Sequence, residues 1–132
     1  MQLVQQTESK KCTKCGEEKP AQPEYWTSRD GRLRGTCRVC TNKAAIERQR
    51  FAKFGITADE YNALYEEQSG CCACCGTHQL EQSKSMAVDH CHDTGKIRGL
   101  LCFDCNVGIG KLGDNLDGVM NAVKYLKEVI YV

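Results

Sequence analysis

Apolar side chains recur three and four residues apart in an otherwise polar segment, at Tyr61, Leu64 and Tyr65. Residues at this spacing share one face of an α-helix, so the pattern predicts an amphipathic helix. Its start is marked by Thr57 and, three residues later, by Glu60. This spacing is typical of a capping box, which satisfies the free backbone N–H groups of a first turn. We expect the helix to end at Gly70.

Two further helices are expected. Residues 38–53 contain neither glycine nor proline and include several strong helix formers, and Gly55 is expected to end that helix. A last helix is expected over residues 115–129. Its apolar positions form one stripe, at Leu116, Val119, Met120, Val123, Leu126 and Ile130. The stripe is expected either to close the core or to form the seam of a homodimer, and the sequence leaves both alternatives open.

Residues 86–91 and 96–101 have the pattern of two strands, and the segment Asp93-Thr94-Gly95 between them is typical of a turn. A β-hairpin is therefore expected here. Together with the helices, it predicts a small α+β protein whose parts share little core. The expected division is an N-terminal module over residues 1–56 and a second domain over residues 57–132.

The net charge of +1 indicates no class of partner, but the charges are unevenly distributed. Residues 1–56 hold 12 Lys and Arg against 6 Asp and Glu, whereas residues 57–132 hold 6 against 11. A basic half can bind phosphates and an acidic half can bind a divalent cation. The alternative is an ordinary solvated surface.

Eleven cysteines are a high number for 132 residues. No apolar run approaches the ~20 residues that a membrane span needs, and residues 1–6 lack the features of a signal peptide. We therefore expect a cytoplasmic protein with no membrane partner. In a reducing compartment, and with an odd count, the cysteines favour zinc thiolates over disulfides.

Pairs of cysteines with the spacing Cys-x2-Cys are typical of tetrahedral zinc sites, because one tight turn supplies two ligands. Two such pairs predict a first zinc site, at Cys12, Cys15, Cys37 and Cys40. A core as small as this chain allows is not expected to be stable without metal.

The second zinc site has two possible registers, because residues 71–75 read Cys-Cys-Ala-Cys-Cys. Gly16 follows the first pair, and a glycine there permits the positive φ that turns backbone amides toward sulfur. Gly76 stands in the same place after Cys75. The expected ligands are therefore Cys72, Cys75, Cys102 and Cys105, and the remaining thiols are Cys71, Cys74 and Cys91. His78 is interpreted as a surface histidine. Both zinc ions would be structural, because four thiolates leave no open position for water.

Asp89 and His90 are adjacent in the expected hairpin, and Asn106 directly follows the last cysteine ligand. An aspartate oxygen suits Mg²⁺ or a similar divalent cation, the Asn106 carbonyl can be a second ligand, and a histidine can be a general base near neutral pH. His92 is included with these candidate catalytic residues. An ion held by two protein oxygens keeps positions for water and phosphate, so the set predicts phosphodiester hydrolysis. The alternative is that Asp89 caps a turn and that His90 and His92 only coordinate zinc or lie beside it.

Two sets of basic residues are candidates for contacting DNA phosphates, which requires no reading of base sequence. The first set lies on the helix expected at 38–53 and consists of Lys43, Arg48, Arg50 and Lys53. The second lies on the return strand of the hairpin and consists of Lys96 and Arg98.

The cysteine pair at 72–75, residues 88–92 (Val-Asp-His-Cys-His) and residues 95–106 (Gly-Lys-Ile-Arg-Gly-Leu-Leu-Cys-Phe-Asp-Cys-Asn) resemble the recombination endonuclease VII family. This is a group of HNH-type nucleases with the His-Me finger, or ββα-metal, fold. The resemblance is close over residues 68–110 and extends more weakly upstream.

The resemblance implies a metal-dependent DNA endonuclease acting on duplex or branched DNA, in the host cytoplasm if it is phage-encoded. It implies that Asp89 and Asn106 hold the catalytic ion, that His90 is the base, and that Cys72 and Cys75 are zinc ligands. One position departs from the family: Ile109 stands where a well-known member has an acidic residue. The chain also ends soon after one helix, so cleavage is better supported than junction resolution. The rival function is a non-catalytic, zinc-dependent module that binds DNA or protein.

Overall fold

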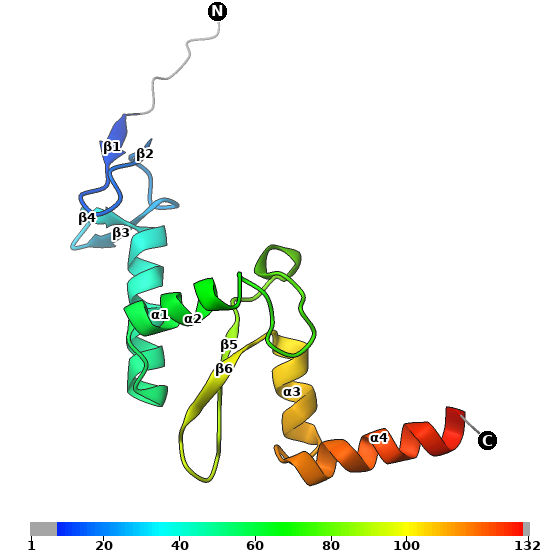
Figure 1. The fold of residues 1–132 in the computed structure, drawn as a ribbon. Helices are drawn as coiled ribbons and strands as arrows, with labels where there is room; N and C mark the ends of the chain where they lie inside the picture. Colours follow the sequence, from blue (N-terminus) through cyan, green and yellow to red (C-terminus); the bar gives the residue numbers. More distant parts are fainter. Residues whose placement is uncertain (1–7, 131–132) are drawn as a thin grey trace, which may run out of the picture. The chain divides into compact units, whose positions relative to one another are not determined.

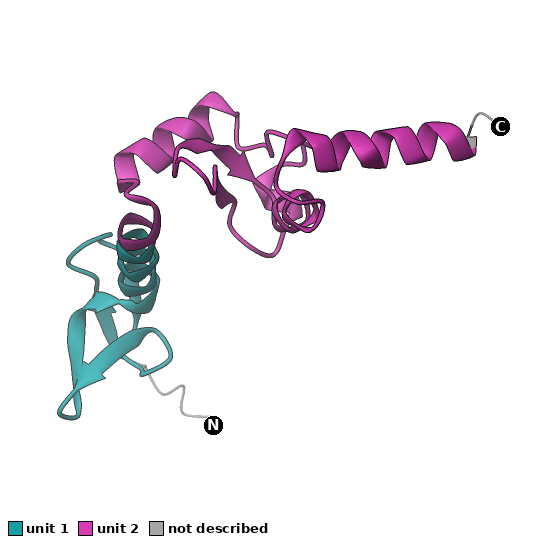
Figure 2. Cartoon of the chain, turned by 90° about the horizontal axis from the view of Figure 1, so that it is seen from below, with its two compact units in different colours: residues 1–49 teal, residues 50–132 magenta. Residues whose placement is uncertain are grey.

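The computed structural model describes residues 8–130, which form four α-helices and three two-stranded antiparallel sheets (Figure 1). The chain divides into two compact units, residues 1–49 and residues 50–132 (Figure 2). The elements are β1 (Ser9–Lys11), β2 (Glu18–Pro20), β3 (Trp26–Arg29), β4 (Arg32–Cys37), α1 (Arg38–Phe54), α2 (Ala58–Glu67), the short 3₁₀ helix η1 (Gln79–Glu81), β5 (Ala87–His90), β6 (Ile97–Leu101), α3 (Phe103–Lys111) and α4 (Leu116–Ile130). The expected small α+β fold is confirmed.

The first unit has a very small core. Trp26 is completely buried and is surrounded by Cys12 and Cys37, with Leu33 partly buried against them. The indole N–H of Trp26 donates to the carbonyl of Pro20 at 2.8 Å, which joins the two hairpins β1–β2 and β3–β4. A core of this size buries too little apolar surface to offset the chain entropy of folding. Two cysteines of the first predicted zinc site, Cys12 and Cys37, form part of this core.

The core of the second unit lies between the β5–β6 hairpin, α2 and α3. Both helices contact β6. Its most buried apolar side chains are Ile56, Met86, Val88, Leu100 and Leu101. Tyr61 of α2 is buried with them, and its hydroxyl donates to the carbonyl of Met86 at 2.8 Å. This bond satisfies a polar group that burial would otherwise leave without a partner.

The capping box of α2 is confirmed. The backbone N–H of Glu60 donates to the Thr57 hydroxyl at 3.2 Å, and the N–H of Thr57 donates to the Glu60 carboxylate at 2.8 Å. The helix ends at Glu67, three residues before the expected Gly70. Gln68 is the C-cap, and its N–H still bonds to the carbonyl of Leu64 at 3.0 Å. The chain turns away at Ser69, whose φ of 54° is left-handed, so the helix ends before Gly70.

Gln68 holds the edge of β6. Its side-chain oxygen accepts from the N–H of Leu100, and its amide donates to the carbonyl of the same residue, both at 2.9 Å. The amide also donates to the carbonyl of Cys71 at 2.9 Å. The N–H of Ala73 donates to the same Leu100 carbonyl at 3.1 Å, so Gln68 and Ala73 together cover this sheet edge.

Three turns of the chain share one backbone pattern. The N–H of a cysteine donates to the carbonyl five residues later, and a glycine four residues after the cysteine donates back to the cysteine carbonyl. The turns begin at Cys12, Cys72 and Cys91, and their glycines have φ angles of 74°, 78° and 72°. The tip of the β5–β6 hairpin therefore has the form of a zinc-binding turn, with Thr94 in the place of the second cysteine.

The boundary between the two units falls within α1, between residues 49 and 50. The last turn of α1 packs with the second unit: Phe54 contacts its core, and the guanidinium carbon of Arg50 lies 3.5 Å from the centre of the Tyr61 ring. Composition alone placed the division after residue 56. Side-chain packing, which composition does not report, assigns the end of the helix to the second unit.

A tight junction connects α3 to α4. The side-chain oxygen of Asn115 caps α4 by accepting from the N–H of Gly118 at 2.7 Å, and the N–H of Asp114 donates to the carbonyl of Ile109 at 3.0 Å. Asp114 has a φ of 54°, a left-handed conformation that is uncommon for a residue other than glycine. A Cβ atom on Gly118 would overlap the carbonyl oxygen of Leu112, so only glycine allows this approach of the two helices.

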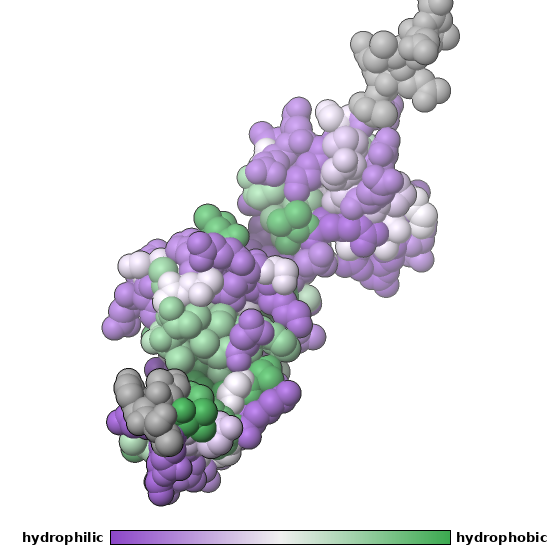
Figure 3. All heavy atoms as spheres, turned by 90° about the vertical axis from the view of Figure 1, so that its right-hand side faces the viewer, coloured by the Kyte–Doolittle hydropathy of each residue, from purple (hydrophilic) through white to green (hydrophobic). Residues whose placement is uncertain are grey.

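The apolar stripe of α4 is mostly exposed: Leu116, Met120 and Leu126 keep 75%, 52% and 53% of their surface. Figure 3 shows apolar side chains on the surface of the C-terminal unit, in the lower part of the view. The side chain of Ile130, which was expected in the stripe, lies outside the described residues. Within residues 8–130, no helix has both the length and the apolar character needed to cross a lipid bilayer.

Candidate active site and metal centres

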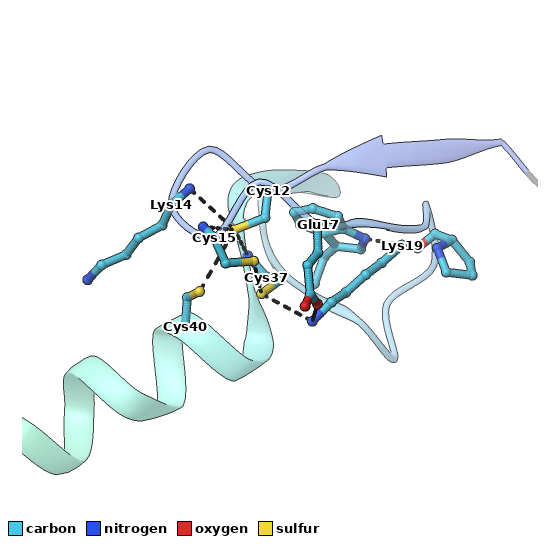
Figure 4. A network of polar contacts seen from close by, with 9 residues as sticks. Cys12, Lys14, Cys15, Glu17, Lys19, Cys37 and Cys40 are labelled. Carbon is cyan, nitrogen blue, oxygen red and sulfur yellow. Dashed lines mark hydrogen bonds and ion pairs between the residues drawn. The ribbon is translucent and has the colours of Figure 1, made fainter. Parts of the chain in front are cut away.

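The sulfur atoms of Cys12, Cys15, Cys37 and Cys40 converge on one point, as Figure 4 shows, and lie within 4.8 Å of one another. The Cys12–Cys40 and Cys15–Cys37 sulfur separations are 4.0 and 3.9 Å. Four sulfurs that surround a zinc ion tetrahedrally at about 2.3 Å stand about 3.8 Å apart. The group therefore has the dimensions of a zinc site.

Backbone N–H groups make Cys12 the most acidic thiol of this group. Its sulfur accepts from the N–H of Cys15 at 3.5 Å and from that of Cys37 at 3.3 Å, and these bonds lower its pKa to about 5. Burial, together with the neighbouring thiols, raises the pKa of Cys40 to about 12. Lys19 adds one positive charge, with its ammonium 3.5 Å from the Cys37 sulfur (Figure 4). Full ionisation of four thiols needs more positive charge than Lys19 provides, and a divalent metal ion at this point would supply it.

A second group of four sulfurs lies at the expected cysteines, and its role as a metal site stays a prediction. The sulfurs of Cys72, Cys75, Cys102 and Cys105 lie within 4.8 Å of one another. Those of Cys75 and Cys102 are 3.8 Å apart. Cys102 is the N-cap of α3, and its sulfur accepts from the N–H of Cys105 at 3.4 Å. The same cysteine thus belongs to the four-cysteine group and begins the helix. Cys71, Cys74 and Cys91 belong to neither group. His78 is also outside both, and its Nδ1 accepts from the N–H of Leu80 to cap η1.

Asp89 and Arg98 form a two-point ion pair across the β5–β6 hairpin. Nε and Nη2 of Arg98 donate to the two carboxylate oxygens of Asp89, each at 2.8 Å. A β-bulge places Arg98 there, because Asp89 pairs with Gly99 and His90 with Ile97, which leaves Arg98 as the extra residue. The Asp89 side chain is only 14% exposed, so this ion pair is sheltered from most of the solvent.

Asp114 joins this ion pair from the α3–α4 junction. Its Oδ1 accepts from Nη2 of Arg98 at 2.6 Å, and its Oδ2 lies 3.3 Å from Nε2 of His92. The Arg98 guanidinium lowers the pKa of Asp114, and hydrogen bonds to Asp89 and Asp114 raise the pKa of Arg98 above its usual value. Sequence reasoning missed Asp114, because no motif marks it and it is far from Asp89 in the chain.

The imidazole of His90 packs against two rings. Its centre lies 5.0 Å from the centre of the Phe54 ring, at an interplanar angle of 53°, and 5.0 Å from that of His92, at 46°. Phe54 is the last residue of α1 and was also missed by sequence reasoning. The contacts run without interruption from Phe54 through His90, His92, Asp114 and Arg98 to Asp89. We call these six residues the Asp89–His90 cluster.

Asn106 lies half-buried in the first turn of α3, directly after Cys105, and α3 packs against both β5 and β6. One turn later Ile109 lines an open hollow of about 280 Å³ together with Asp89, Arg98 and Asp114. Position 109 thus carries no acid, but the carboxylate of Asp114, from the junction after α3, lines the same hollow. The metal group holds the start of α3, and α3 in turn carries Asn106.

The basic residues differ in their surroundings. Arg50 is half-buried against Tyr61, and the Lys53 ammonium lies 5.1 Å from the centre of the Phe54 ring. Lys43 and Arg48 are exposed on α1 in the first unit, and Lys96 is exposed beside the hairpin turn. Arg98 alone of the predicted DNA-contact residues belongs to the Asp89–His90 cluster.

The β3–β4 hairpin presents a second basic surface, which sequence reasoning missed. Arg29 and Arg32 are direct partners across the two strands, and Arg34 follows two residues later, so it shares their face. All three are exposed. Like charges directly opposite one another destabilise a sheet. An anion between them would remove this repulsion. We call these three residues the arginine face.

A model of the recombination endonuclease VII family matches residues 47–128. The chain belongs to this family. The match contains the second metal group and all six residues of the Asp89–His90 cluster, including Phe54 and Asp114. Most of the first unit, with its own four cysteines, lies outside the matched segment.

Two relatives carry the name Gene 59 protein. That of Mycobacterium phage D29 is 42% identical over 92 residues, and that of Mycobacterium phage L5 is 38% identical over 90 residues. The matches cover 69% and 67% of this chain and 55% and 54% of the relatives, so the chain spans about half their length. Among solved structures, the chain is similar to the ββα-Me type II restriction endonuclease Hpy99I, with a TM-score of 0.41 and 22% identity. That similarity covers 92% of this chain and 66% of the restriction enzyme.

Proposed function

We propose that the chain is a metal-dependent DNA endonuclease that hydrolyses phosphodiester bonds. Membership of the recombination endonuclease VII family supports this activity. The observation that carries the proposal is the Asp89–His90 cluster. It combines a sheltered carboxylate, a histidine packed against two rings and an arginine, next to a four-cysteine group that stabilises the surrounding fold. Residues of these types are the ones that phosphodiester hydrolysis needs.

We propose that Asp89 and the carbonyl of Asn106 hold Mg²⁺ or another divalent cation. The donors fit such an ion, because they are hard oxygens and because Asp89 and Asp114 together carry more negative charge than Arg98 neutralises. When bound, the ion would stabilise negative charge on the phosphate oxygens.

The remaining candidate residues have proposed roles of their own. His90 accepts the proton of the attacking water at an imidazole nitrogen, while packing against Phe54 and His92 limits rotation of the ring. Arg98 and Lys96 are proposed to contact phosphate. The two four-cysteine groups are proposed to hold structural zinc, because their sulfur separations fit that ion.

DNA is the proposed partner, in duplex or branched form. Branched DNA is included because the family is named for recombination. The exposed Lys43 and Arg48 are proposed to contact the phosphate backbone, and the arginine face is a further candidate. Arg50 and Lys53 would reach DNA only around the aromatic rings that they cover. Because the relatives are phage proteins, the host cytoplasm is the proposed location.

A second copy of the chain is proposed to cover the exposed stripe of α4. Leu116, Met120 and Leu126 project more than half of their surface into solvent, which is unfavourable for apolar side chains in such number. Sedimentation equilibrium of the wild type and of Met120→Lys tests this proposal. A wild type that stays monomeric at high concentration would rule out the homodimer.

The nuclease proposal is tested by incubating the zinc-loaded chain with supercoiled plasmid, linear duplex and a four-way junction in Mg²⁺ or Mn²⁺. We expect cleavage by the wild type and a loss of at least about 100-fold in His90→Ala, because general-base catalysis contributes roughly 10²–10⁴-fold. His78→Ala is the matched control, since His78 caps η1 and lies outside the cluster. It is expected to cut at the wild-type rate.

Two outcomes would contradict the proposal. A wild type that binds DNA without nicking any of the three substrates in either ion would support the rival function, a non-catalytic binding module. Equal cleavage by His90→Ala and the wild type would remove His90 as the base. The ratio of junction cleavage to linear-duplex cleavage measures the preference for branched DNA separately.

A further inference from the structure

Arg98 is shared by two carboxylates that come from different elements. Its Nη2 donates both to Oδ1 of Asp89 at 2.8 Å and to Oδ1 of Asp114 at 2.6 Å, and its Nε holds the second oxygen of Asp89. The Asp89 and Asp114 side chains are 14% and 15% exposed, and Arg98 is 35% exposed. The guanidinium thus occupies the oxygens of Asp89 that a divalent cation would use. A cation at Asp89 would therefore compete with Arg98 for the charge of the same carboxylate.

Release of Asp89 would leave Arg98, whose side chain is 35% exposed, without its two-point ion pair. A second carboxylate would then keep the long, partly solvated side chain in one orientation. Asp114 already holds Nη2 and would keep the guanidinium in place, while Nε and the remaining N–H groups of Arg98 become free. Donors in this fork geometry match the oxygens of a phosphate.

The position of Asp114 is enforced by the fold around it. Its left-handed backbone conformation, with φ 54°, costs free energy for a residue other than glycine, and such strain is found where the surrounding structure requires it. Here the Asp114 N–H is bound to the carbonyl of Ile109, and Asn115 caps α4 immediately afterwards. Gly118 permits the close approach of α4 to Leu112. These contacts place the Asp114 carboxylate beside Arg98 of the β5–β6 hairpin. The α3 residue that lines the same hollow, Ile109, is apolar.

We propose that Asp114 is a positioning residue that retains Arg98 when Asp89 turns to the divalent cation, and so converts Arg98 from the counter-ion of Asp89 into a phosphate-binding group. This inference deepens the proposed nuclease function, on which the phosphate role rests. The exchange of partners at Asp89 does not depend on cleavage. It makes an unusual prediction: removing Arg98 strengthens cation binding while it weakens DNA binding.

The test is a double-mutant cycle on the full, zinc-loaded chain, with Mn²⁺ affinity measured by electron paramagnetic resonance. We expect Arg98→Ala to bind Mn²⁺ about three- to tenfold more tightly than the wild type, because a competing ion pair is removed. Asp114→Asn is expected to bind Mn²⁺ about three- to tenfold more weakly, because Arg98 then has only Asp89 as a charged partner. The double variant is expected to recover the affinity of Arg98→Ala.

Asparagine at 114 tolerates the left-handed conformation and has a similar shape, so the fold is expected to persist. Circular dichroism checks this. Asp104→Asn is the matched control, because Asp104 is exposed in the first turn of α3, outside the cluster. It is expected to bind Mn²⁺ like the wild type.

DNA affinity is the second measurement, made in Mn²⁺ on a His90→Ala background so that cleavage does not intervene. Arg98→Ala and Asp114→Asn are each expected to weaken binding, and the double variant is expected to be no weaker than Arg98→Ala alone. Asp114 acts through Arg98, so its effect disappears when Arg98 is absent.

Several results would overturn the inference. Equal weakness of Asp114→Asn and the double variant toward Mn²⁺ would make Asp114 a direct ligand of the ion. The proposed role would also be removed if Asp114→Asn bound Mn²⁺ as tightly as the wild type, or if the wild type bound no Mn²⁺. Additive effects of the two substitutions on DNA affinity would remove it as well. A chain that shows the expected Mn²⁺ pattern but cuts no DNA would refute the nuclease function alone.

Discussion

The ring of Phe54 packs on the imidazole of His90, with the two ring centres 5.0 Å apart. Phe54 is the final residue of α1, and His90 is the final residue of β5, so this contact connects the end of a helix to the candidate base. The contacts with Phe54 and His92 restrict where the imidazole nitrogens point. Catalysis depends on such placement, because small errors in geometry lower the rate of the chemical step.

Removal of the Phe54 ring is therefore expected to reduce cleavage. In Phe54→Ala we expect the single-turnover rate to fall about ten- to hundredfold, because His90 then lacks a neighbour that orients it. Phe51→Ala is the control, since Phe51 lies on the same helix and is 58% exposed. Single-turnover kinetics on a labelled duplex measure both variants. A Phe54→Ala chain that is folded and cuts at the Phe51→Ala rate would show that the packing contact has no catalytic role.

The register of the second metal group can be tested by neighbouring cysteines. Native mass spectrometry is expected to detect two zinc ions per chain in the wild type and in Cys74→Ser, but only one in Cys75→Ser, because only Cys75 belongs to the four-cysteine group. Both residues are exposed, so burial does not distinguish the two variants. The reverse result would assign the zinc to the other pair of cysteines.

Removal of zinc by a strong chelator is expected to unfold both units, because structural zinc contributes its binding free energy directly to folding. Metal analysis measures the loss of zinc, and far-UV circular dichroism on the same samples measures unfolding. Re-addition of zinc should restore the spectrum. An unchanged spectrum in a chain shown to be free of metal would contradict the structural role.

The α3–α4 junction is expected to tolerate no side chain at Gly118. Gly118→Ala should destabilise the second unit by roughly 1–3 kcal/mol, because its Cβ would overlap the Leu112 carbonyl oxygen and force the helices apart. Gly110→Ala is the matched control on α3, where the new Cβ would contact nothing within 4 Å. It should stabilise the helix by about 0.5–1 kcal/mol. Urea unfolding measures both, and a Gly118→Ala chain as stable as the wild type would refute the close approach.

The arginine face gives a prediction about DNA affinity. Arg32→Ala/Arg34→Ala should weaken binding to duplex DNA and reduce the slope of log affinity against log salt by about 0.9 for each DNA phosphate that is no longer neutralised. Lys124→Ala/Lys127→Ala removes the same number of positive charges from exposed positions on α4 and is the control. Equal effects of the two double variants would mean that only total charge, and no defined surface, determines the affinity.

The sequence by itself determined the features that depend on neighbouring residues. The capping box at Thr57 and Glu60 set the start of α2, and the glycine after each cysteine pair pointed to the four cysteines whose sulfurs lie together. The same holds for the β5–β6 hairpin, whose strands and turn follow one another in the chain. Local backbone preferences and short-range hydrogen bonds decide these features, so a linear pattern records them.

Only the tertiary structure decided which distant side chains surround Asp89 and His90. Phe54 arrives from the end of α1 and Asp114 from the α3–α4 junction, and neither belongs to a local motif. Their positions depend on how the helices pack against the hairpin and on a glycine that lets two helices approach. Gln68 shows the same limit, since its side chain bonds to both backbone groups of Leu100, which is 32 residues away in the chain. Such contacts arise from packing across long sequence separations, and a pattern of neighbouring residues does not encode them.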